Sequence, residues 1–357
     1  MARELCQGLQ GLGHQVQIFT GFMRNSIPEN DDMFSQKHTL VKPLSQRFLT
    51  SSLWSNRLPK DLLKLIRSAD IVHIHFAREI IPIITAFMCI LLKKPYITQT
   101  HGMVIKDPRL ASIVIDRLFV RFALRHSRVN LALHEHELSQ IIEMDSGCKN
   151  FILPNGITIQ KLPKKRPKND PLRIVFCSRI QKRKRPDRFL SLARYAYEHE
   201  IKAEFIIYGP DGGQLPELLT EIENEPKLQN VVYKGPLMPN KVLQALASTD
   251  LLVLPSENEP FPMIVLESLS VGTPVLIMPS CQIAELIRIT FPKLVANKDT
   301  TEALFPKFRD LVESQTTEAD RAALIDFCRN TFNQSEVIAQ LNLIYQSEIS
   351  EFLGHYK

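Results

Sequence analysis

Short apolar runs, separated by longer amphipathic stretches, are the feature that most constrains how this chain can fold. They lie at residues 15–20, 71–75, 96–98, 129–133 and 151–153 in the first half, and at 172–177, 203–208, 231–233, 251–254 and 274–277 in the second. Runs of this length that alternate with helical stretches are typical of βαβ units, whose strands are buried on both faces of a parallel sheet. The pattern therefore predicts an α/β fold with two Rossmann-like, doubly wound domains.

A segment rich in proline and basic residues separates the two series of runs. It covers residues 161–171, and its prolines and charges prevent regular strand pairing. We interpret it as an interdomain linker, which divides the chain into a first domain at 1–160 and a second at 172–335. A length of 357 residues is suited to two domains. A ligand is expected between two such domains, at the carboxyl ends of their strands.

The composition is that of a soluble globular protein, with 44% hydrophobic and 23% charged residues. The six cysteines are far apart and form no Cys-x-x-Cys pair, which indicates buried thiols in a reducing compartment. No signal peptide opens the chain, and the longest apolar run, residues 80–92, is too short to span a bilayer and contains Pro82. These features predict a cytoplasmic protein.

The positive charge is concentrated in the first half of the chain. Residues 1–160 contain 19 Lys and Arg against 13 Asp and Glu, and the remainder contains 25 of each. Such an excess can favour an anionic membrane surface, a phosphorylated acceptor or nucleic acid, and it can equally be a solvated face. The charge alone leaves these alternatives open.

Two glutamates eight residues apart are the most specific chemical signal. Glu259 lies in the loop after the predicted strand 251–254, and Glu267 lies in the helix that follows. The amino end of a helix offers free N–H groups and a positive dipole end to a diphosphate. Carboxylates accept paired hydrogen bonds from sugar or ribose hydroxyls. The alternative is a pair of surface glutamates around a helix start, where acidic residues are common.

A second signal is the basic stretch after the predicted strand 172–177. Arg179 ends the strand and Lys184 follows in the loop, so both cations can converge on a diphosphate. Fixed cations near a diphosphate stabilise the negative charge that grows on a departing phosphate more than they stabilise the ground state. The alternative for this run of basic residues is a solvated loop or a nucleic-acid patch.

Two further motifs follow strands. Tyr208-Gly209-Pro-Asp-Gly-Gly213 is a glycine-rich strand-to-helix turn, which is as consistent with a tight turn as with contact to a nucleotide. Thr98-Gln-Thr-His101-Gly102 places His101 at the end of a first-domain strand. A lone histidine at a strand end is more often structural.

Together these motifs resemble the signature of family 4 retaining glycosyltransferases, the glycogen-synthase-like group with the GT-B fold. The resemblance runs from Gly13-His-Gln-Val16 to Phe332 and includes the Pro-Asn155-Gly turn before the hinge. It implies that residues 1–160 form the acceptor-side domain, 172–335 the nucleotide-sugar domain, and 336–357 a helix that returns to the first domain. Departures are Pro260 and Pro262 beside Phe261, and Ser178 and Arg185, all where relatives carry glycines.

The resemblance also assigns roles to the residues of these motifs. Glu259, His101, Arg179 and Lys184 are expected to be catalytic, acting on the transferred sugar and the diphosphate. Glu267 is expected to bind the nucleotide ribose and Gly209 to lie near the base. The backbone N–H groups of Phe261, Met263 and Ile264 are expected near the sugar and diphosphate; each neighbouring proline removes one donor.

The implied function is transfer of a hexose, with retention, from a nucleotide-diphosphate sugar to a glycan or lipid-linked acceptor in surface polysaccharide or lipopolysaccharide synthesis. We expect no cofactor beyond this co-substrate, no nucleic-acid partner, and peripheral contact with the inner face of the membrane through the basic first half. No metal is expected, because the chain has no Asp-x-Asp and neither His73-x-His75 nor His134-x-His136 has a third ligand at characteristic spacing.

Two other functions were weighed. A noncatalytic protein that binds sugar nucleotide or polysaccharide is the main alternative, and a nucleotide-sugar epimerase ranks lower because that fold relative lacks the arrangement of two glutamates. In the family a strand and a Gly-Gly loop precede the helix that ends in Gly13-His14, whereas this sequence begins inside that helix. We therefore expect a first strand to be missing, with the true start upstream, and little activity in the chain as written.

Overall fold

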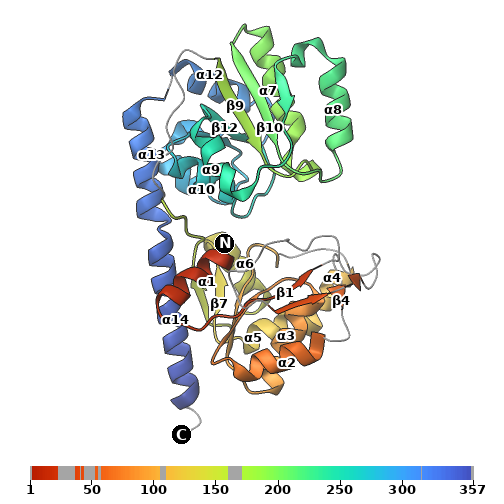
Figure 1. Ribbon diagram of the computed structural model, residues 1–357, viewed down its shortest axis with the longest axis vertical. Coiled ribbons are helices and arrows are strands. Elements are labelled where there is room, and N and C mark those ends of the chain that lie inside the picture. The colour runs from red at the N-terminus through yellow and green to blue at the C-terminus, as the bar shows by residue number, and fades with distance from the viewer. Residues whose placement is uncertain are drawn as a thin grey trace. The chain divides into compact units, whose positions relative to one another are not determined.

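The structure is a computed structural model that describes residues 2–22, 37–40, 42–43, 53–54, 58–104, 110–159, 171–314 and 316–354 (Figure 1). The chain divides into two compact units. The first comprises Met1–Asn155 together with Ser335–Lys357, and the second comprises Gly156–Gln334. The linker predicted at 161–171 lies outside the described residues except for Pro171.

The second unit contains a five-stranded parallel sheet in the order β11-β10-β9-β12-β13. Its strands are β9 (Leu172–Cys177), β10 (Ala203–Tyr208), β11 (Val231–Tyr233), β12 (Leu251–Leu254) and β13 (Val275–Ile277). The order reverses between β9 and β12, as in a doubly wound sheet, and a ligand site is expected outside the strand ends at such a point. The predicted strands of this half are thus confirmed almost residue for residue.

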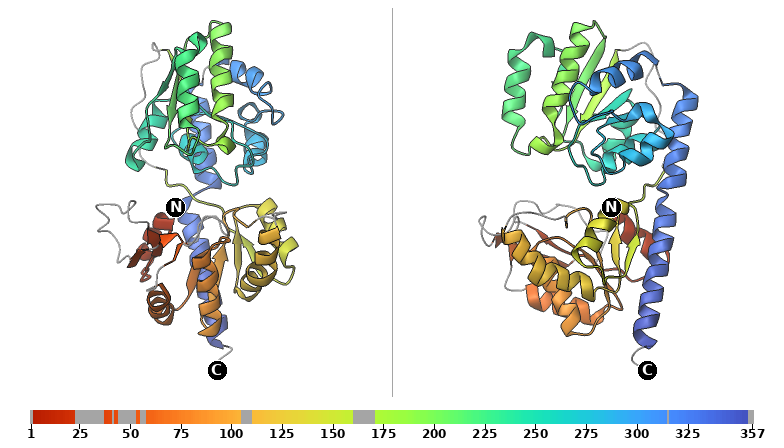
Figure 2. Two further views of the ribbon diagram at one scale, coloured as in Figure 1. Left: turned by 90° about the vertical axis from the view of Figure 1, so that its right-hand side faces the viewer. Right: turned by 180° about the vertical axis from the view of Figure 1, so that it is seen from behind.

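Helices cover both faces of this sheet (Figure 2). Val175 and Leu252 point into one apolar cluster, and Ile174 and Phe176 point into a second one on the other face. The helices are α7 (Pro186–Glu198), α8 (Leu215–Asn224), α9 (Pro239–Ala247), α10 (Met263–Ser270), α11 (Ala284–Thr290), α12 (Leu304–Ser314) and α13 (Glu318–Thr331), with short 3₁₀ turns η2 (Lys182–Lys184), η3 (Pro226–Leu228) and η4 (Pro292–Leu294). Burial on both faces explains why these strands read as continuous apolar runs.

The first unit contains a four-stranded parallel sheet in the order β5-β6-β7-β8. The strands are β5 (Val72–His75), β6 (Tyr96–Gln99), β7 (Asn130–Ala132) and β8 (Asn150–Ile152). Its helices are α1 (Ala2–Gly11), α2 (Leu58–Ser68), α3 (Ile80–Leu91), α4 (Leu110–Ile115), the π-helical turn η1 (Asp116–Val120), α5 (Arg121–His126), α6 (Glu135–Met144) and the long α14 (Gln334–Gly354). Two parallel α/β domains are therefore present.

The last helix of the chain, α14, packs within the first unit. Leu341 and Tyr345 share an apolar cluster with Leu9 of α1 and Leu131 of β7. Further along the helix, the buried Glu348 carboxylate accepts a hydrogen bond from Arg128 at 3.0 Å and another from Lys149. Apolar burial and paired charges thus both hold α14 to this unit.

The start of the first unit differs in part from the prediction. The strand predicted at 15–20 begins only at Phe19, where β1 (Phe19–Phe22) finds a parallel partner in β2 (Lys37–Leu40); residues 14–18 have no ladder. A short antiparallel pair, β3 (Lys42–Pro43) and β4 (Leu53–Trp54), had not been predicted. Within the described residues, neither pair is hydrogen-bonded to the four-stranded sheet.

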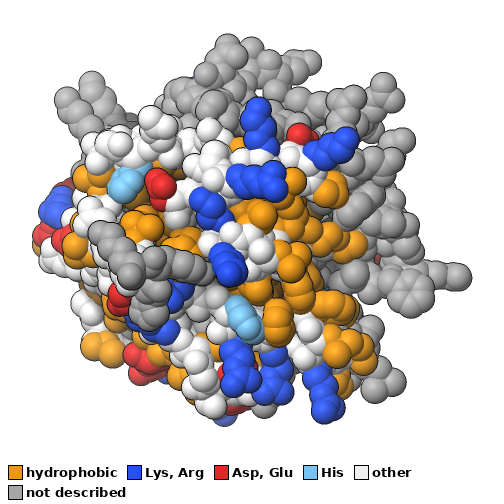
Figure 3. Space-filling model, turned by 90° about the horizontal axis from the view of Figure 1, so that it is seen from below, with side chains coloured by type: hydrophobic (Ala, Val, Ile, Leu, Met, Phe, Trp, Pro, Cys, Tyr) orange, Lys and Arg blue, Asp and Glu red, His pale blue; other side chains and the backbone are white. Residues whose placement is uncertain are grey.

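Helices α3 and α5 lie on the underside of Figure 1. The face seen from there carries a broad area of hydrophobic side chains with Lys and Arg side chains beside it (Figure 3). Among the described residues, no helix has both the length and the apolar character that crossing a membrane requires.

Candidate functional site

The loop after β12 brings Glu259 to the carboxyl edge of the five-stranded sheet. The fully buried strand ends at Leu254, and Pro260 and Pro262 prevent the loop from continuing as strand or helix until α10 begins at Met263. Asn258, directly before Glu259, has φ +49, a left-handed conformation that asparagine tolerates well. The local sequence therefore fixes where the glutamate emerges.

The Glu259 carboxylate is held by two cations from η2. Lys184 Nζ lies 2.5 Å from Glu259 Oε2, and Arg183 Nη1 lies 3.3 Å from the same oxygen. The Lys184 and Glu259 side chains are 13% and 8% exposed, whereas Arg183 is 45% exposed. The structure thus brings together two of the predicted catalytic residues and adds a third group, Arg183, which the sequence reading had not singled out.

The charge state of Lys184 reflects two opposing influences. Burial lowers the pKa of Lys184, and the attraction of the adjacent Glu259 carboxylate opposes that shift. A lysine whose ammonium is partly desolvated and already ordered by a carboxylate is well placed to interact with a further anion at that edge. Since only one Glu259 oxygen is engaged by these cations, the second oxygen can accept other hydrogen bonds.

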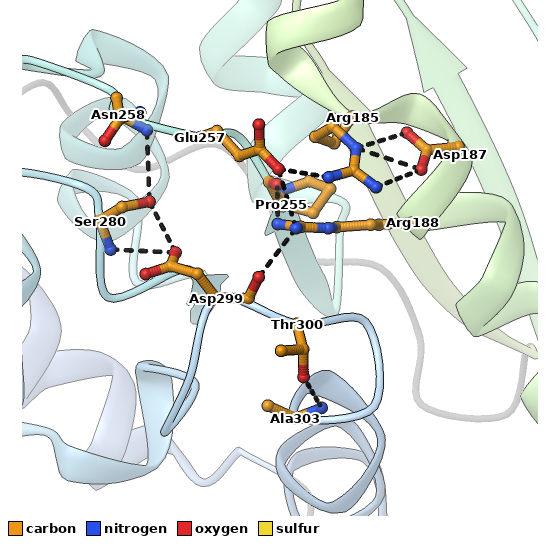
Figure 4. Close-up of polar contacts among 10 residues, drawn as sticks. All are labelled: Arg185, Asp187, Arg188, Pro255, Glu257, Asn258, Ser280, Asp299, Thr300 and Ala303. Carbon is orange, nitrogen blue, oxygen red and sulfur yellow. Dashed lines mark hydrogen bonds and ion pairs between the residues drawn. The ribbon is translucent and has the colours of Figure 1, made fainter.

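A network of charged side chains fixes this loop against α7 (Figure 4). Glu257 accepts hydrogen bonds from Arg185 and, at 2.9 Å, from Arg188; Arg188 also donates to the carbonyl oxygens of Pro255 and Asp299, at 3.4 Å and 2.9 Å. Arg188 is nearly fully buried, and burial lowers its pKa. Because Arg188 donates hydrogen bonds to carbonyl oxygens of this region, we interpret it as a structural anchor for the loop that carries Glu259.

A second set of bonds holds the same loop from the other side. Ser280 Oγ donates to Asp299 Oδ1 at 2.6 Å and accepts from the Asn258 N–H at 3.2 Å, and the Glu259 carbonyl accepts from the Gln282 N–H at 2.9 Å. Sequence patterns do not reveal these anchors, because the paired residues lie 19 to 111 positions apart in the chain (Figure 4). Only the run of basic residues 182–185 was a visible signal.

Glu267 lies in the second turn of α10, next to the end of β9. Burial and the nearby Glu267 carboxylate raise the pKa of Cys177, the last residue of β9, to about 12. Arg179 follows two residues later, is exposed, and has no ion pair within the part of the chain that the structure describes. The site residues Glu267 and Arg179 therefore both lie at the edge where Lys184 and Glu259 meet.

Gly209 makes a close backbone approach that a side chain would block. It has φ +147, and a Cβ built there would lie 1.8 Å from the carbonyl oxygen of Ser178. The turn is fixed on both sides, since the Gly209 N–H donates to Gly235 at 3.0 Å and its carbonyl accepts from the Tyr233 hydroxyl at 2.8 Å. Packing against the end of β9 is sufficient to require glycine here, so contact with a nucleotide base stays a prediction.

The start of α10 presents backbone donors at the same edge. Met263 and Ile264 are its first two residues, and the first N–H groups of a helix have no carbonyl partner within that helix. The preceding Pro262 contributes no donor. Phe261 is half-buried, and its ring packs edge-on against Phe332 at 5.8 Å between centroids. The positions of these three residues are compatible with an anion at the helix start, which remains a prediction.

His101 lies at the end of β6 in the first unit, in a turn with φ +49. Its Nε2 is 2.6 Å from His75 Nδ1, and the rings of His73, His75 and His101 stack in sequence, 4.9 Å apart at each step. Burial and the neighbouring His75 lower the pKa of His101 to about 3, and burial also lowers the pKa of both other histidines. All three rings are therefore neutral at physiological pH, and His101 can act as a hydrogen-bond partner but not as a cation.

A buried glutamate shapes the turn that carries His101. Glu137 of α6 is 1% exposed, and its carboxylate accepts hydrogen bonds from the Thr100 hydroxyl, from the Gly102 N–H at 2.5 Å and from the Leu133 N–H at 2.7 Å. Satisfying three donors offsets the cost of burying its charge. His134 and His136, just before it, were visible as a sequence motif, whereas Glu137 was not predicted.

Among the described residues, His134 and His136 do not form a metal-binding group with other side chains. His134 caps α6 by accepting from the Glu137 N–H at 3.2 Å, and exposed His136 contacts Gln140. The described residues hold no group of three or more His, Cys, Asp or Glu side chains arranged to bind a metal ion. Metal independence nonetheless stays a prediction.

Two family models match the chain. Residues 1–161 match "Glycosyltransferase Family 4", and residues 158–329 match "Glycosyl transferases group 1". The junction of the two matches falls close to the boundary between the two compact units. The chain belongs to the family 4, group 1 glycosyltransferases. Its fold is GT-B, as the resemblance had implied.

Known glycosyltransferases are similar to this chain in sequence and in structure. Over 105 residues the chain is 33% identical to an alpha-galactosylglucosyldiacylglycerol synthase of Streptococcus pneumoniae, a match covering 29% of this chain and 28% of that protein. A glycosyltransferase structure from Rickettsia africae aligns with TM-score 0.74 and 16% identity over 97% of this chain and 93% of that one. Anabaena Alr3699/HepE, solved with UDP-glucose, aligns with TM-score 0.72 and 16% identity over 87% and 86%. These structural likenesses show the fold alone.

Proposed function

We propose that this glycosyltransferase moves a hexose from a nucleoside-diphosphate sugar to its acceptor with retention of configuration and without a metal ion. The observation that carries the proposal is the Glu259 carboxylate, which is pinned by Lys184 and Arg183 directly before the amino end of α10. A carboxylate, clustered cations and helix N–H groups at one sheet edge are the groups that a sugar diphosphate needs. The UDP-glucose bound by Alr3699/HepE supports this donor class.

Each group then has a chemical task. Glu259 accepts hydrogen bonds from the hydroxyls of the transferred sugar, and Glu267 accepts them from the ribose. Lys184 and Arg179 neutralise the diphosphate as it departs, with the N–H groups of Met263 and Ile264 on the same oxygens. The departing phosphate oxygen deprotonates the acceptor on the same face of the sugar, so no side-chain nucleophile is required. His101, being neutral, hydrogen-bonds a sugar hydroxyl.

The acceptor is proposed to be a glycan or a lipid-linked sugar in surface polysaccharide or lipopolysaccharide synthesis. Support comes from the name of the Streptococcus pneumoniae relative, a synthase of a diacylglycerol glycolipid. The basic excess of residues 1–160 is consistent with work at the inner face of a membrane, where such acceptors are held.

A panel of UDP-, GDP- and ADP-sugars, assayed for transfer and for hydrolysis, tests the proposal. Glu259→Gln and Lys184→Met should each lower turnover by about 10²–10³-fold, the usual effect of removing one group that stabilises the transition state. Glu285→Gln and Lys182→Met, which change exposed residues of the same types, should leave it unchanged. Product anomers should match the donor by NMR, and EDTA should have no effect.

Several results would contradict the proposal. Full activity in either site variant would remove the role assigned to that residue, and an inverted product would exclude retention. Donor binding without transfer or hydrolysis, in every member of the panel, would instead support the noncatalytic alternative.

A further inference from the structure

The outward face of α4, η1 and α5 in the first unit is apolar where a soluble helix would be polar. Val114 and Leu118 are 54% and 57% exposed, and Ile113, Phe119 and Phe122 are also exposed. Single exposed apolar residues are ordinary, but five of them within ten residues form a continuous patch, and such patches mark interaction sites.

Basic residues alternate with these apolar ones in a regular way. Val114, Leu118 and Phe122 recur every four residues, and exposed Arg117 and Arg121 recur in step one position earlier, followed by Arg125. Residues four apart lie on one side of a helix, so an apolar stripe and an arginine stripe run side by side. We call the outward side chains of Ile113 to Arg125 the apolar–basic face.

Within the described part of the chain, the arginines of this face are not neutralised by neighbours. Asp116 is the one acidic residue in the stretch 110–126, and its two oxygens accept from Arg78 at 2.6 Å and 2.8 Å. Arg117, Arg121 and Arg125 have no ion pair among the residues that the structure describes. The face therefore presents three positive charges available to an external anion.

The end of α3 extends the apolar part of the face. Phe87 packs on Phe122 with ring centroids 5.2 Å apart and on Phe119 at 6.0 Å. Leu91, one turn further along α3, is 81% exposed, and exposed Lys93 follows it. Aromatic rings with adjacent cations are the residues that favour the boundary between lipid headgroups and acyl chains.

We propose that the apolar–basic face docks this protein on a bilayer of anionic lipids. The apolar side chains enter the boundary between headgroups and acyl chains, and the arginines contact the lipid phosphates. Lipid phosphates suit this face because three exposed arginines lie within the patch and, among the residues that the structure describes, none of them has an acidic partner. The inference rests on the proposed function in one respect: the membrane-linked acceptor gives a reason for docking, because docking would bring that acceptor to the first unit.

Flotation of the full chain with vesicles tests the docking face. Vesicles of phosphatidylglycerol and phosphatidylcholine should bind the protein far better than phosphatidylcholine alone. Each arginine near an anionic surface contributes about fivefold to binding at low salt, so Arg117→Gln, Arg121→Gln and Arg125→Gln together should weaken it about 100-fold. Replacing the apolar pair, Val114→Ser with Leu118→Ser, should weaken it at least about tenfold.

Matched variants in the second unit control for charge and hydrophobicity. The charge control combines Lys202→Gln, Lys241→Gln and Lys298→Gln, and the apolar control combines Met238→Ser and Ile289→Ser; all five residues are exposed. Both controls should float like the unaltered protein. Circular dichroism of every variant should show an unchanged thermal transition, because the replaced side chains are on the surface.

The proposal is overturned if the unaltered protein does not float with anionic vesicles, or if the face variants float as well as their controls. A dimer that forms without lipid and is lost in the Val114→Ser, Leu118→Ser variant would identify the face as a contact between two copies. Donor turnover, measured without vesicles in the same variants, should be unchanged. That measurement separates a failure of docking from a failure of the proposed chemistry.

Discussion

Replacing Lys184 with methionine tests how far the candidate site depends on its buried ion pair. Methionine keeps the apolar stem of the side chain but removes the ammonium that lies 2.5 Å from Glu259 Oε2. Removing one member of a fully buried pair costs about 3–5 kcal/mol, because the other charge is left without its counter-ion. Arg183, at 3.3 Å and 45% exposed, remains to offset part of that loss, so we expect about 2–3 kcal/mol for this site.

Calorimetry is the appropriate measurement, because two units can unfold separately. For a unit of this size, a loss of 2–3 kcal/mol lowers the transition temperature by about 4–12 °C. Lys182→Met, in the same 3₁₀ turn but exposed, should change it little. Urea unfolding followed by circular dichroism gives the free energy independently.

A double-mutant cycle with Glu259→Gln isolates the pair itself. If the two charges interact as the geometry indicates, the double variant should be more stable than the sum of the single effects predicts, by about 1–3 kcal/mol. Additive effects would mean that the contact contributes nothing in solution. The reasoning that links this ion pair to a preorganised site would then be refuted.

Three further predictions concern both units. Glu137→Gln should destabilise the first unit by about 1–3 kcal/mol in urea unfolding, because an amide cannot accept from all three donors, whereas exposed Glu135→Gln in the same turn should not. Gly209→Ala should cost more than Gly213→Ala; both pay backbone strain of about 1–3 kcal/mol, but only the first also displaces the Ser178 carbonyl. Since the pKa of His101 is lowered to about 3, unfolding takes up protons below pH 6.5, so stability should fall as pH drops from 6.5, by at most about 1.4 kcal/mol per pH unit for this ring. His101→Gln should flatten that slope and His136→Gln should not.

The strands of the second unit could be predicted because burial on both faces leaves a direct mark on sequence. β9, β10, β11 and β12 coincide with their predicted ranges, and β13 differs by one residue. The start of the first unit was harder to predict from the sequence. β1 begins where a partner strand is available, and partner availability is a property of tertiary structure that no local run of residues encodes.

The site shows a similar division between what sequence can and cannot reveal. Spacing relative to strand ends was enough to select Glu259 and Lys184, which the structure places in contact. The groups that hold them, Arg188 and Glu257, and the Glu137 clamp in the first unit were missed. Each depends on groups that are distant in the sequence: carbonyl oxygens for Arg188, arginine side chains for Glu257, and a backbone N–H group for Glu137.

The same principle explains why buried charges, and not only the motif residues, should govern activity in this protein. Glu259 can meet a sugar in one orientation only if its loop is fixed, and that loop is fixed by Arg188, which donates to the carbonyl oxygens of Pro255 and Asp299. Arg188→Lys keeps the charge but cannot reach two carbonyls and the Glu257 carboxylate at once. Its effect should therefore fall on turnover through a mispositioned Glu259, while Arg309→Lys, at an exposed site on α12, leaves turnover unchanged. If Arg188→Lys retained full turnover, positioning of the loop by buried charge would not limit the reaction.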